Sequence, residues 1–323
     1  MVWDLCVQRN CSEAYILKKY KIYQVDSFTR NCFHGNPAGV VPDAAGLSDE
    51  QMQRIARELN NSETAFIFPS DSPDNDVEVR FFTPTTEVPI CGHATVAAHY
   101  VYALEKNFGS RRIRQKTKAG ILPVDIIQKD DDYSIIMTPG TPVVSEDLGG
   151  EVRNRIADAL GISTDDICKE YPVAISSTGH SKVMVPICSN QLLHSLKPDL
   201  QKLTEISSAV GCNGYYVFTL NPGEDVLVHG RMFAPAIGIA EDPVTGNANG
   251  PLGAYLVYYN ILQNHEESHF DFSIMQGEAI QRDGTMRVHV EKENGKPILV
   301  QITGDAVIAF SAEIIIKSEI CNS

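Results

Sequence analysis

The sequence predicts an α+β fold made of two similar halves, in which strands wrap around one central helix in each half. At 323 residues the chain exceeds the usual span of one hydrophobic core, so two domains or one doubled domain are expected. A block of strand, loop and helix recurs in the same order in the second half of the chain. Segments with helical spacing are interspersed with segments that alternate like strands. These three observations favour a duplicated α+β unit.

The repeated block reads as an Arg-x-Phe-x-Pro strand end, a loop, a Gly-polar-Ala turn and a helix rich in small residues. It spans residues 80–101 and again residues 231–257. Upstream of each copy, just after a helical pattern, lies a strand-like segment, at 62–68 and at 213–218. Similar strand-loop-helix units are common in α/β proteins, but two matches in the same order favour a duplication. Alanines and glycines in the helix would let the surrounding strands approach its backbone closely.

The remaining elements follow from periodicity. Helical spacing runs over 49–59 and over 200–210, whereas 113–127 and 286–302 alternate as strands. The turn signals for these strands are the dipeptides Asp283-Gly284 and Asn294-Gly295.

The crossing between the halves is predicted near Gly140, Pro142 and the Gly149-Gly150 pair, since glycine and proline interrupt regular structure. The fold pattern starts at Lys21, so the residues before it are interpreted as an appended arm. The predicted division is an arm at 1–20, a first domain at 21–138 completed by 305–318, and a second domain at 139–304.

Charge and cysteine usage exclude several classes of protein. The formal net charge of -14 repels nucleic acid and anionic membranes, and the longest basic stretch is the short one at 111–118. Charged residues interrupt 1–20, and no later run approaches the roughly twenty apolar residues of a membrane span. The eight cysteines are dispersed, without a C-x-x-C pair or zinc-ligand spacing. We therefore expect a cytoplasmic protein with reduced thiols, no metal, no nucleic-acid partner and no membrane.

Two glycine-led turns are candidate substrate-binding elements. A helix N-terminus presents unpaired N–H groups and the positive end of the helix dipole, which favours anions. The repeat supplies one such turn at Gly92-His93 and another at Gly246-Asn247. If the halves pack about a pseudo-twofold axis, both turns face one cleft and hold a substrate carboxylate.

Glu63 is the candidate acid/base residue near these turns. It stands between Ser62 and Thr64 at the start of an apolar strand, where partial desolvation would suit a carboxylate to general acid or base work. A capping or edge glutamate is the alternative interpretation of Glu63. His93 could polarise a carbonyl or shuttle a proton, or it could simply be a hydrogen-bonded histidine at a buried helix start.

Two further candidates also have structural alternatives. Asp242 precedes Pro243, so it is either a cleft carboxylate or an Asp-Pro turn residue. Cys91 is either a thiolate whose pKa is lowered by the adjacent helix start or a small buried hydrophobic residue.

At these residues the sequence closely resembles the phenazine-biosynthesis PhzF-like family, a branch of the diaminopimelate-epimerase-like fold. The Ser62-Glu63-Thr64 block and the block from Glu241 to Asn247 are a specific pair, and the match covers nearly everything after residue 20. The sequence is similar to the uncharacterised isomerases of the YddE type, which also have asparagine where the phenazine enzyme has serine. The other matching blocks lie at 23–28, 35–40, 56–66, 91–95, 178–181 and 211–214.

The resemblance implies two domains of alike topology, each a barrel-like mixed sheet around a central helix, with the active site in the cleft between them. It implies that Glu63 is the general acid/base, with His93 and Asp242 as further catalytic residues. Gly92 and Gly246 would supply backbone N–H groups to the substrate. Asn247 replaces the family's serine, and the family often forms homodimers.

The mechanism follows from what each turn carries. Related epimerases place one cysteine in each turn, whereas here only the first turn has one, Cys91, and the second offers Thr245, Gly246 and Asn247. None of these three is a competent base near neutral pH. We therefore expect a metal- and cofactor-independent isomerase that shifts a proton on a small carboxylated metabolite. The alternatives are an epimerase or racemase using Cys91, or a binding protein that kept the cleft and lost the chemistry.

Overall fold

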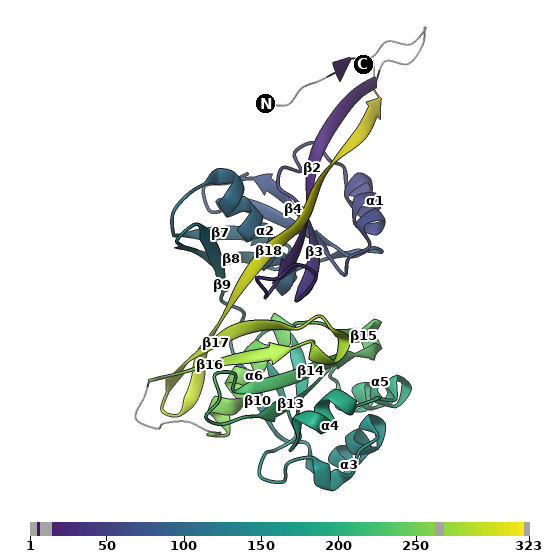
Figure 1. Ribbon diagram of the computed structural model, residues 1–323, viewed down its shortest axis with the longest axis vertical. Helices are drawn as coiled ribbons and strands as arrows, with labels where there is room; N and C mark the ends of the chain where they lie inside the picture. Colours follow the sequence, from purple (N-terminus) through teal and green to yellow (C-terminus); the bar gives the residue numbers. More distant parts are fainter. Residues whose placement is uncertain (1–4, 7–14, 262–267, 320–323) are drawn as a thin grey trace.

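The computed structural model describes residues 5–6, 15–261 and 268–319 of the chain. Two bodies lie one above the other, and the long strand β18 (Lys296–Glu319) runs through both (Figure 1). Its first part pairs with the second body and its last part with the first. Among the described residues, no helix has the length and apolar character needed to cross a membrane.

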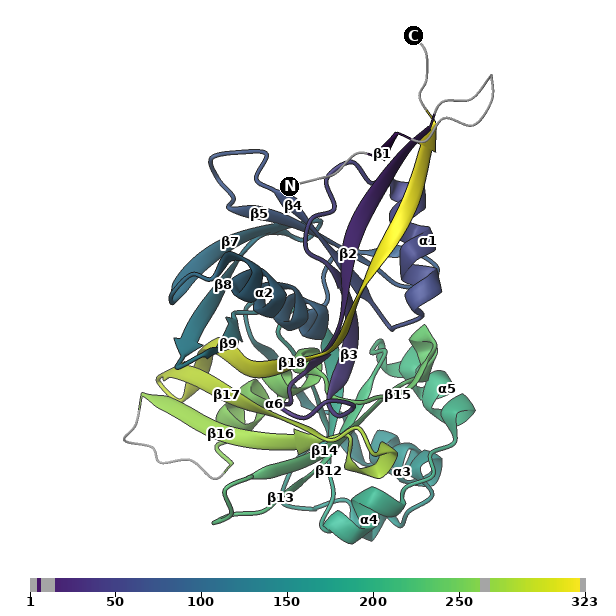
Figure 2. The same cartoon turned by 45° about the horizontal axis from the view of Figure 1, so that its top comes forward.

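The first half is a closed, barrel-like sheet around a buried helix. Its strands follow one another by hydrogen bonding in the order β18-β2-β3-β4-β5-β7-β8-β9, and β9 pairs again with β18. Helix α2 (Gly92–Lys106) lies inside this sheet and α1 (Asp49–Leu59) covers its outside (Figure 2). The strands are β1 (Leu5–Cys6), β2 (Tyr15–Ser27), β3 (Asn36–Val41), β4 (Thr64–Pro69), β5 (Val77–Phe82), β6 (Glu87–Val88), β7 (Arg111–Thr117), β8 (Gly120–Lys129) and β9 (Asp132–Met137).

The second half repeats this arrangement around helix α6 (Gly246–Tyr258). Its strands are β10 (Val143–Asp147), β11 (Ala174–Ser177), β12 (Ser181–Pro186), β13 (Tyr215–Leu220), β14 (Val228–Ala234), β15 (Ile239–Asp242), β16 (His269–Gln276) and β17 (Gly284–Glu293). Its other helices are α3 (Gly149–Leu160), α4 (Asn190–Ser195) and α5 (Leu200–Val210), with the 3-10 turns η1 (Thr164–Asp166), η2 (Pro235–Ile237) and η3 (Glu278–Ile280).

Equivalent pairings relate the two halves. The parallel pair β3 and β4 corresponds to β12 and β13, and the parallel pair β5 and β7 corresponds to β14 and β16. The repeated arginine plays the same part in both copies. Arg80 forms a bidentate ion pair with Glu87, and Arg231 forms one with Glu241. The predicted α+β fold of two alike halves, each with a barrel-like sheet around a central helix, is confirmed.

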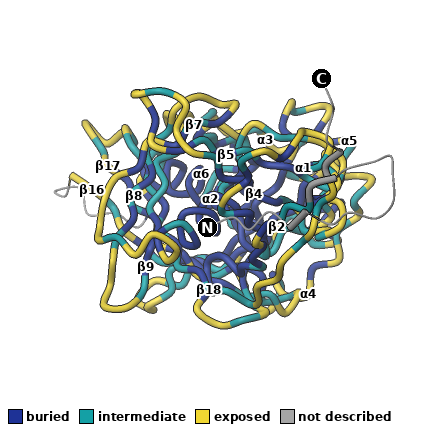
Figure 3. The backbone as a smooth tube through the Cα atoms, turned by 90° about the horizontal axis from the view of Figure 1, so that it is seen from above, coloured by how far each residue is buried: buried dark blue, intermediate teal, exposed yellow. Residues whose placement is uncertain are grey.

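Small residues let the sheets close over the central helices. A Cβ atom on Gly253 would lie only 2.7 Å from Val288 Cγ1 and 2.8 Å from Val290 Cγ2. Figure 3 shows the buried backbone gathered around α2 and α6, with exposed loops at the rim. The central helices are therefore the core of each half, and their first residues lie at the boundary between the halves.

Local signals placed several elements correctly. Helices α1 and α5 have the bounds that the helical spacing predicts, and α1 begins with a capping box between Ser48 and Gln51. Asn294 and Gly295, with φ of 51° and 76°, form the predicted hairpin turn between β17 and β18.

Other local signals were misleading. Gly284 is the first residue of β17 rather than a turn residue, because its neighbour Asp283 packs on the first half, where its carbonyl accepts from Gly35 N. Strand β2 begins at Tyr15, earlier than the predicted start at Lys21, because β18 supplies an antiparallel partner as far as Glu319. Residues 1–4 and 7–14 of the predicted arm lie outside the described residues.

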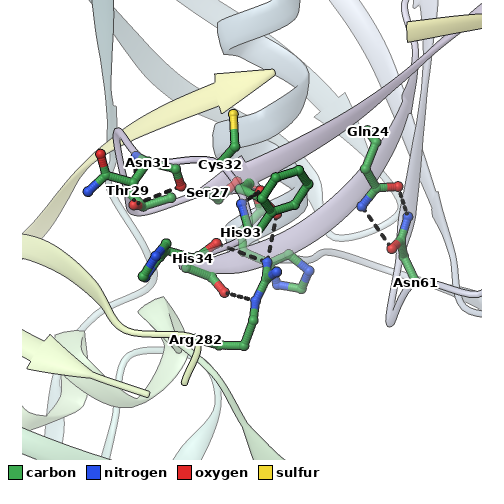
Figure 4. A network of polar contacts seen from close by, with 12 residues as sticks. Gln24, Ser27, Thr29, Asn31, Cys32, His34, Asn61, His93 and Arg282 are labelled. Carbon is green, nitrogen blue, oxygen red and sulfur yellow. Dashed lines mark hydrogen bonds and ion pairs between the residues drawn. The ribbon is translucent and has the colours of Figure 1, made fainter. Parts of the chain in front are cut away.

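A buried ion pair fixes the two halves against each other. Arg282, just before β17, donates from Nη2 to Asp26 Oδ1 at 2.6 Å and to the carbonyl of His34 at 2.9 Å (Figure 4). The Asp26 side chain on β2 is only 2% exposed. Since an uncompensated buried charge is costly, this contact restricts how the halves can move relative to each other.

Candidate active site

A cavity of about 460 Å³ lies between the two halves and is lined by both. The first half contributes residues from the ends of β3 and α1, from the loop before α2, and from the start of α2. The second half contributes β12, β15 and the start of α6. All the residues predicted for the site line this cavity: Glu63, Cys91, Gly92, His93, Asp242, Gly246 and Asn247.

Both central helices begin at the cavity. Helix α2 starts at Gly92 and α6 at Gly246, and the side chain of neither N-cap residue hydrogen-bonds the first turn. The two starts are close to each other, since a Cβ atom on Gly92 would lie 3.9 Å from Asn247 Oδ1. Two sets of N–H groups and two positive dipole ends therefore face one space, an arrangement that suits a carboxylate.

Glu63 and His93 are direct neighbours in the wall of this cavity. His93 Nε2 lies 3.4 Å from Glu63 Oε2 and 3.2 Å from Ser62 Oγ. The Cys91 sulfur lies 3.4 Å from His93 Nδ1 and 3.9 Å from Nε2. The Glu63 side chain remains 18% exposed while that of His93 is 8% exposed, so the carboxylate is accessible from the cavity and the imidazole lies behind it.

A helix end and hydrogen bonds to two strands hold the chain around Glu63. Helix α1 ends at Asn60, which adopts the left-handed conformation with φ of 52° and lets the chain turn towards β4. The next side chain, Asn61, exchanges two amide hydrogen bonds with Gln24 on β2, at 2.8 and 3.0 Å (Figure 4). The backbone carbonyl of Glu63 then accepts from Gly39 N on β3. Contacts on both sides of Glu63 therefore fix where its side chain leaves the backbone.

His93 is held through its backbone as well as its ring. The Ser27 hydroxyl, at the end of β2, donates to the His93 carbonyl at 2.8 Å, and Figure 4 shows the two residues side by side. Thr95 Oγ1 bonds back to the Cys91 carbonyl. These bonds fix the first turn of α2.

Asp242 belongs to a separate hydrogen-bonded network at the start of α6. Its Oδ1 accepts from Asn36 Nδ2 at 2.9 Å, and its Oδ2 accepts from the Thr245 hydroxyl. Gln276 on β16 donates to the Asp242 carbonyl and to Thr245 Oγ1. Burial raises the pKa of the Asp242 carboxyl above its ordinary value, against the opposing effects of His93 and of these hydrogen bonds. Asn36 also donates to the Val244 carbonyl, so it joins the two halves at the site.

Cys91 does not have the character of an activated thiolate. Burial raises its pKa well above the usual range, and the neighbouring Glu63 charge raises it further. Of the two interpretations of Cys91, the small buried residue agrees with this environment, and the thiolate does not, because desolvation and a nearby carboxylate oppose ionisation. The thiol is protonated at neutral pH and is 6% exposed.

Sequence reasoning missed several residues of the site. Asn36 and Lys182 line the cavity, and nothing in their local sequence marks them as buried polar residues. The ion pair of Arg231 and Glu241 also supports the cavity wall, since Arg231 Nη1 donates to the carbonyls of two residues near the end of α4. For this pair a signal existed, because the repeated Arg-x-Phe-x-Pro block contains the arginine in both halves.

Two groups of side chains among the described residues have spacing that could hold a metal ion. One consists of Glu63, Cys91 and His93 in the cavity itself. The other consists of His194, His229 and Glu278 on the second half, where both imidazoles approach the same carboxylate oxygen, at 3.2 and 2.7 Å. Hydrogen bonding to Glu278 raises the pKa of His229, and within this group each imidazole already has the carboxylate as its partner.

Comparison with known proteins agrees with this architecture. The PhzC-PhzF family, described as phenazine biosynthesis-like proteins, matches residues 25–312. An uncharacterised isomerase of Clostridium acetobutylicum is 53% identical over 94% of this chain and 100% of its own length. The uncharacterised isomerase YddE of Escherichia coli K12 is 50% identical over 91% of this chain and 98% of its own.

Solved structures show the same likeness. The crystal structure of a phenazine biosynthesis protein of the PhzF family from Bacillus anthracis superposes with a TM-score of 0.83 at 31% identity, covering 93% of this chain and 100% of that one. A match over most of the sequence, together with relatives of about equal length, leaves one assignment. The chain belongs to the phenazine biosynthesis-like PhzC-PhzF family.

Proposed function

We propose that this chain, an isomerase of the PhzF type, shifts a proton within a small carboxylated substrate and that Glu63 carries the proton. The observation that supports this most directly is the placement of one accessible carboxylate beside two uncapped helix starts in a single cavity. A substrate carboxylate bound by the helix starts would present its neighbouring carbon to Glu63. Binding in this way needs neither a metal ion nor a cofactor.

In the proposed reaction the Glu63 carboxylate removes a proton from a carbon next to an unsaturated group. The electron pair of that C–H bond moves into the unsaturated system as the double bond shifts. The protonated Glu63, whose accessible carboxyl group exchanges its proton with solvent, then gives a proton to another carbon on the same face, which restores the carboxylate. His93, 3.4 Å from Glu63, orients the Glu63 carboxyl group. Asp242, whose carboxylate accepts a hydrogen bond from Asn36, orients the substrate from the opposite side of the cavity.

A two-thiol epimerisation is less compatible with the site. Such a reaction needs one base on each face of the substrate, and Cys91 has Thr245 as its counterpart at the start of α6. The raised pKa of the Cys91 thiol also disfavours its acting as a base at neutral pH. Proton return by a single carboxylate needs no second base.

The test is a screen of small unsaturated and hydroxylated carboxylic acids in D₂O, followed by NMR. The wild-type protein should introduce deuterium into a substrate, and Glu63→Gln should lower that rate by roughly 10²- to 10⁴-fold because the amide cannot accept the proton. Glu58→Gln, an exposed glutamate on α1, is the matched control and should exchange like wild type. Undiminished exchange by a folded Glu63→Gln protein would refute the proposal.

A further inference from the structure

The two halves carry different side chains at equivalent positions of the cavity wall. In the first half, Gly39 N on β3 donates to the carbonyl of Glu63, just before β4. In the second half, Val183 N on β12 donates to the carbonyl of Gly214, just before β13. Gly214 therefore occupies the place in the second half that Glu63 occupies in the first. One residue before the donating N–H group, the second half has the larger side chain, since Ala38 on β3 corresponds to Lys182 on β12.

Lys182 occupies the space left by this glycine. A Cβ atom on Gly214 would lie 2.6 Å from Lys182 Cδ and 3.0 Å from Cε, so the lysine stem crosses the glycine backbone directly. Lys182 is 7% exposed and lines the cavity. The cavity is thus lined by a carboxylate from the first half and by a lysine from the second half, whose stem covers the residue equivalent to Glu63.

This ammonium group has no anionic partner among the described residues. Its Nζ donates to the carbonyl of Ser181 at 3.1 Å, and no described carboxylate oxygen lies within 4 Å of it. Asp242, the nearby acid, has both carboxylate oxygens engaged, one by Asn36 and one by Thr245. Burial lowers the pKa of Lys182, against the opposing effects of Cys212 and Asp242. A buried cation with one neutral acceptor is costly unless an anion comes to it.

We propose that Lys182 binds a second anionic group of the substrate, so that the substrate class is a small molecule with two carboxylates. The helix starts at Gly92 and Gly246 take one carboxylate and Lys182 takes the other, which leaves the connecting carbons beside Glu63. This inference rests on the proposed function for the first carboxylate only. It makes Lys182 a specificity-determining residue.

The test measures equilibrium binding by NMR titration, without any turnover. The probes are the linear dicarboxylates from malonate to adipate, each compared with the monocarboxylate of the same chain length. For at least one pair the wild-type protein should prefer the dicarboxylate by roughly 10- to 100-fold, the value of a charge-assisted hydrogen bond in a buried site. Lys182→Met should bring this preference close to unity, and Lys182→Arg should retain part of it.

Two further variants keep the test decisive. Lys197→Met removes the same charge at an exposed position and should leave the preference unchanged. Gly214→Ala keeps the lysine but displaces its stem, and it should lower the preference even if Lys182→Met does not fold. Equal preferences in the wild type and in a folded Lys182→Met protein, or no preference for any dicarboxylate in the wild type, would overturn the inference.

The outcome is separable from that of the proposed function. Glu63→Gln should lose deuterium exchange and keep the dicarboxylate preference. If the preference depends on Lys182 but deuterium exchange does not depend on Glu63, the second carboxylate site stands and the proton-shift proposal fails. If deuterium exchange depends on Glu63 and the dicarboxylate preference is absent, the proton-shift proposal stands and the second carboxylate site fails.

Discussion

The two halves of the molecule share a backbone plan but differ in the chemistry of the wall that each gives to the cavity. The first half lines the cavity with Glu63, Cys91 and His93. The equivalent residues of the second half are Gly214, Thr245 and Asn247, and Thr245 and Asn247 line the cavity too. Features that serve packing are kept in both halves, including the bidentate arginine pairs and the uncapped helix starts. The comparison indicates that the two halves share a frame of uncapped helix starts, while the carboxylate that we propose to transfer the proton lies on one side only.

The largest effect is expected from moving the carboxylate to the other half. In the double variant Glu63→Gln with Gly214→Glu, activity should stay roughly 10²- to 10⁴-fold below wild type, because the Lys182 stem occupies the space beside position 214. Deuterium incorporation into the substrate measures this. Recovery of activity by the double variant would show that the two walls are interchangeable.

The arginine pairs test how similar the halves are in stability. Arg231 is 7% exposed and also donates to two buried carbonyls, whereas Arg80 is 20% exposed. Arg231→Met should therefore lower the free energy of unfolding by about 3–5 kcal/mol, since it leaves the Glu241 charge buried without a partner. Arg80→Met should cost less, and urea unfolding of both variants gives the comparison. Equal losses in the free energy of unfolding would contradict the expected difference between the halves.

Asp242 should link stability to pH. Its pKa in the folded protein is raised by burial, so the folded state favours the protonated acid. The resulting contribution to stability is complete below the unfolded pKa, about 4, and is lost as the pH rises through the folded value. Asp242→Asn should therefore gain stability relative to wild type across that window, and it should lose activity. Urea unfolding of both proteins between about pH 3 and 7 measures this. A difference in the free energy of unfolding that stays constant with pH would contradict the expectation.

Replacement of Cys91 should have the smallest effect. Because the thiol is protonated at neutral pH, Cys91→Ala should change deuterium exchange by less than about tenfold, below the loss expected for an acid/base residue. Abolished exchange would instead favour an epimerase that uses the first turn alone. NMR in D₂O with the same substrate distinguishes the two outcomes.

The sequence contained most of the local information about the fold. The capping box at Ser48 and the helical spacing that follows set the bounds of α1, and the turn at Asn294-Gly295 needs only residues that accept positive φ. The early start of β2 was not predictable in this way. Its partner is the far end of β18, and a pairing between residues near 15 and near 319 has no local signature.

The residues of the candidate site also differ in how far the sequence marks them. Glu63, His93 and Asp242 could be singled out because they flank repeated blocks and resemble a family motif. Asn36 lies inside a matching block but could not be singled out, since its partners Asp242 and Val244 belong to the other half. Lys182 could not be singled out either, since its stem is covered by Gly214 on a neighbouring strand end. The sequence left two interpretations of Cys91 open, because the desolvation and the Glu63 charge that decide between them appear only in three dimensions. The predicted homodimer, the cytoplasmic location and the division into domains stay predictions.

The central claim is that the starts of α2 and α6 hold one substrate carboxylate while Glu63 faces the carbon that exchanges its proton. A crystal structure of the Glu63→Gln variant with the substrate found in D₂O tests this most directly. The account predicts carboxylate oxygens within hydrogen-bonding distance of the N–H groups of Gly92 and Gly246, with the exchanging carbon next to the side chain at position 63. A substrate bound with its carboxylate away from both helix starts, or with that carbon out of reach of position 63, would contradict it.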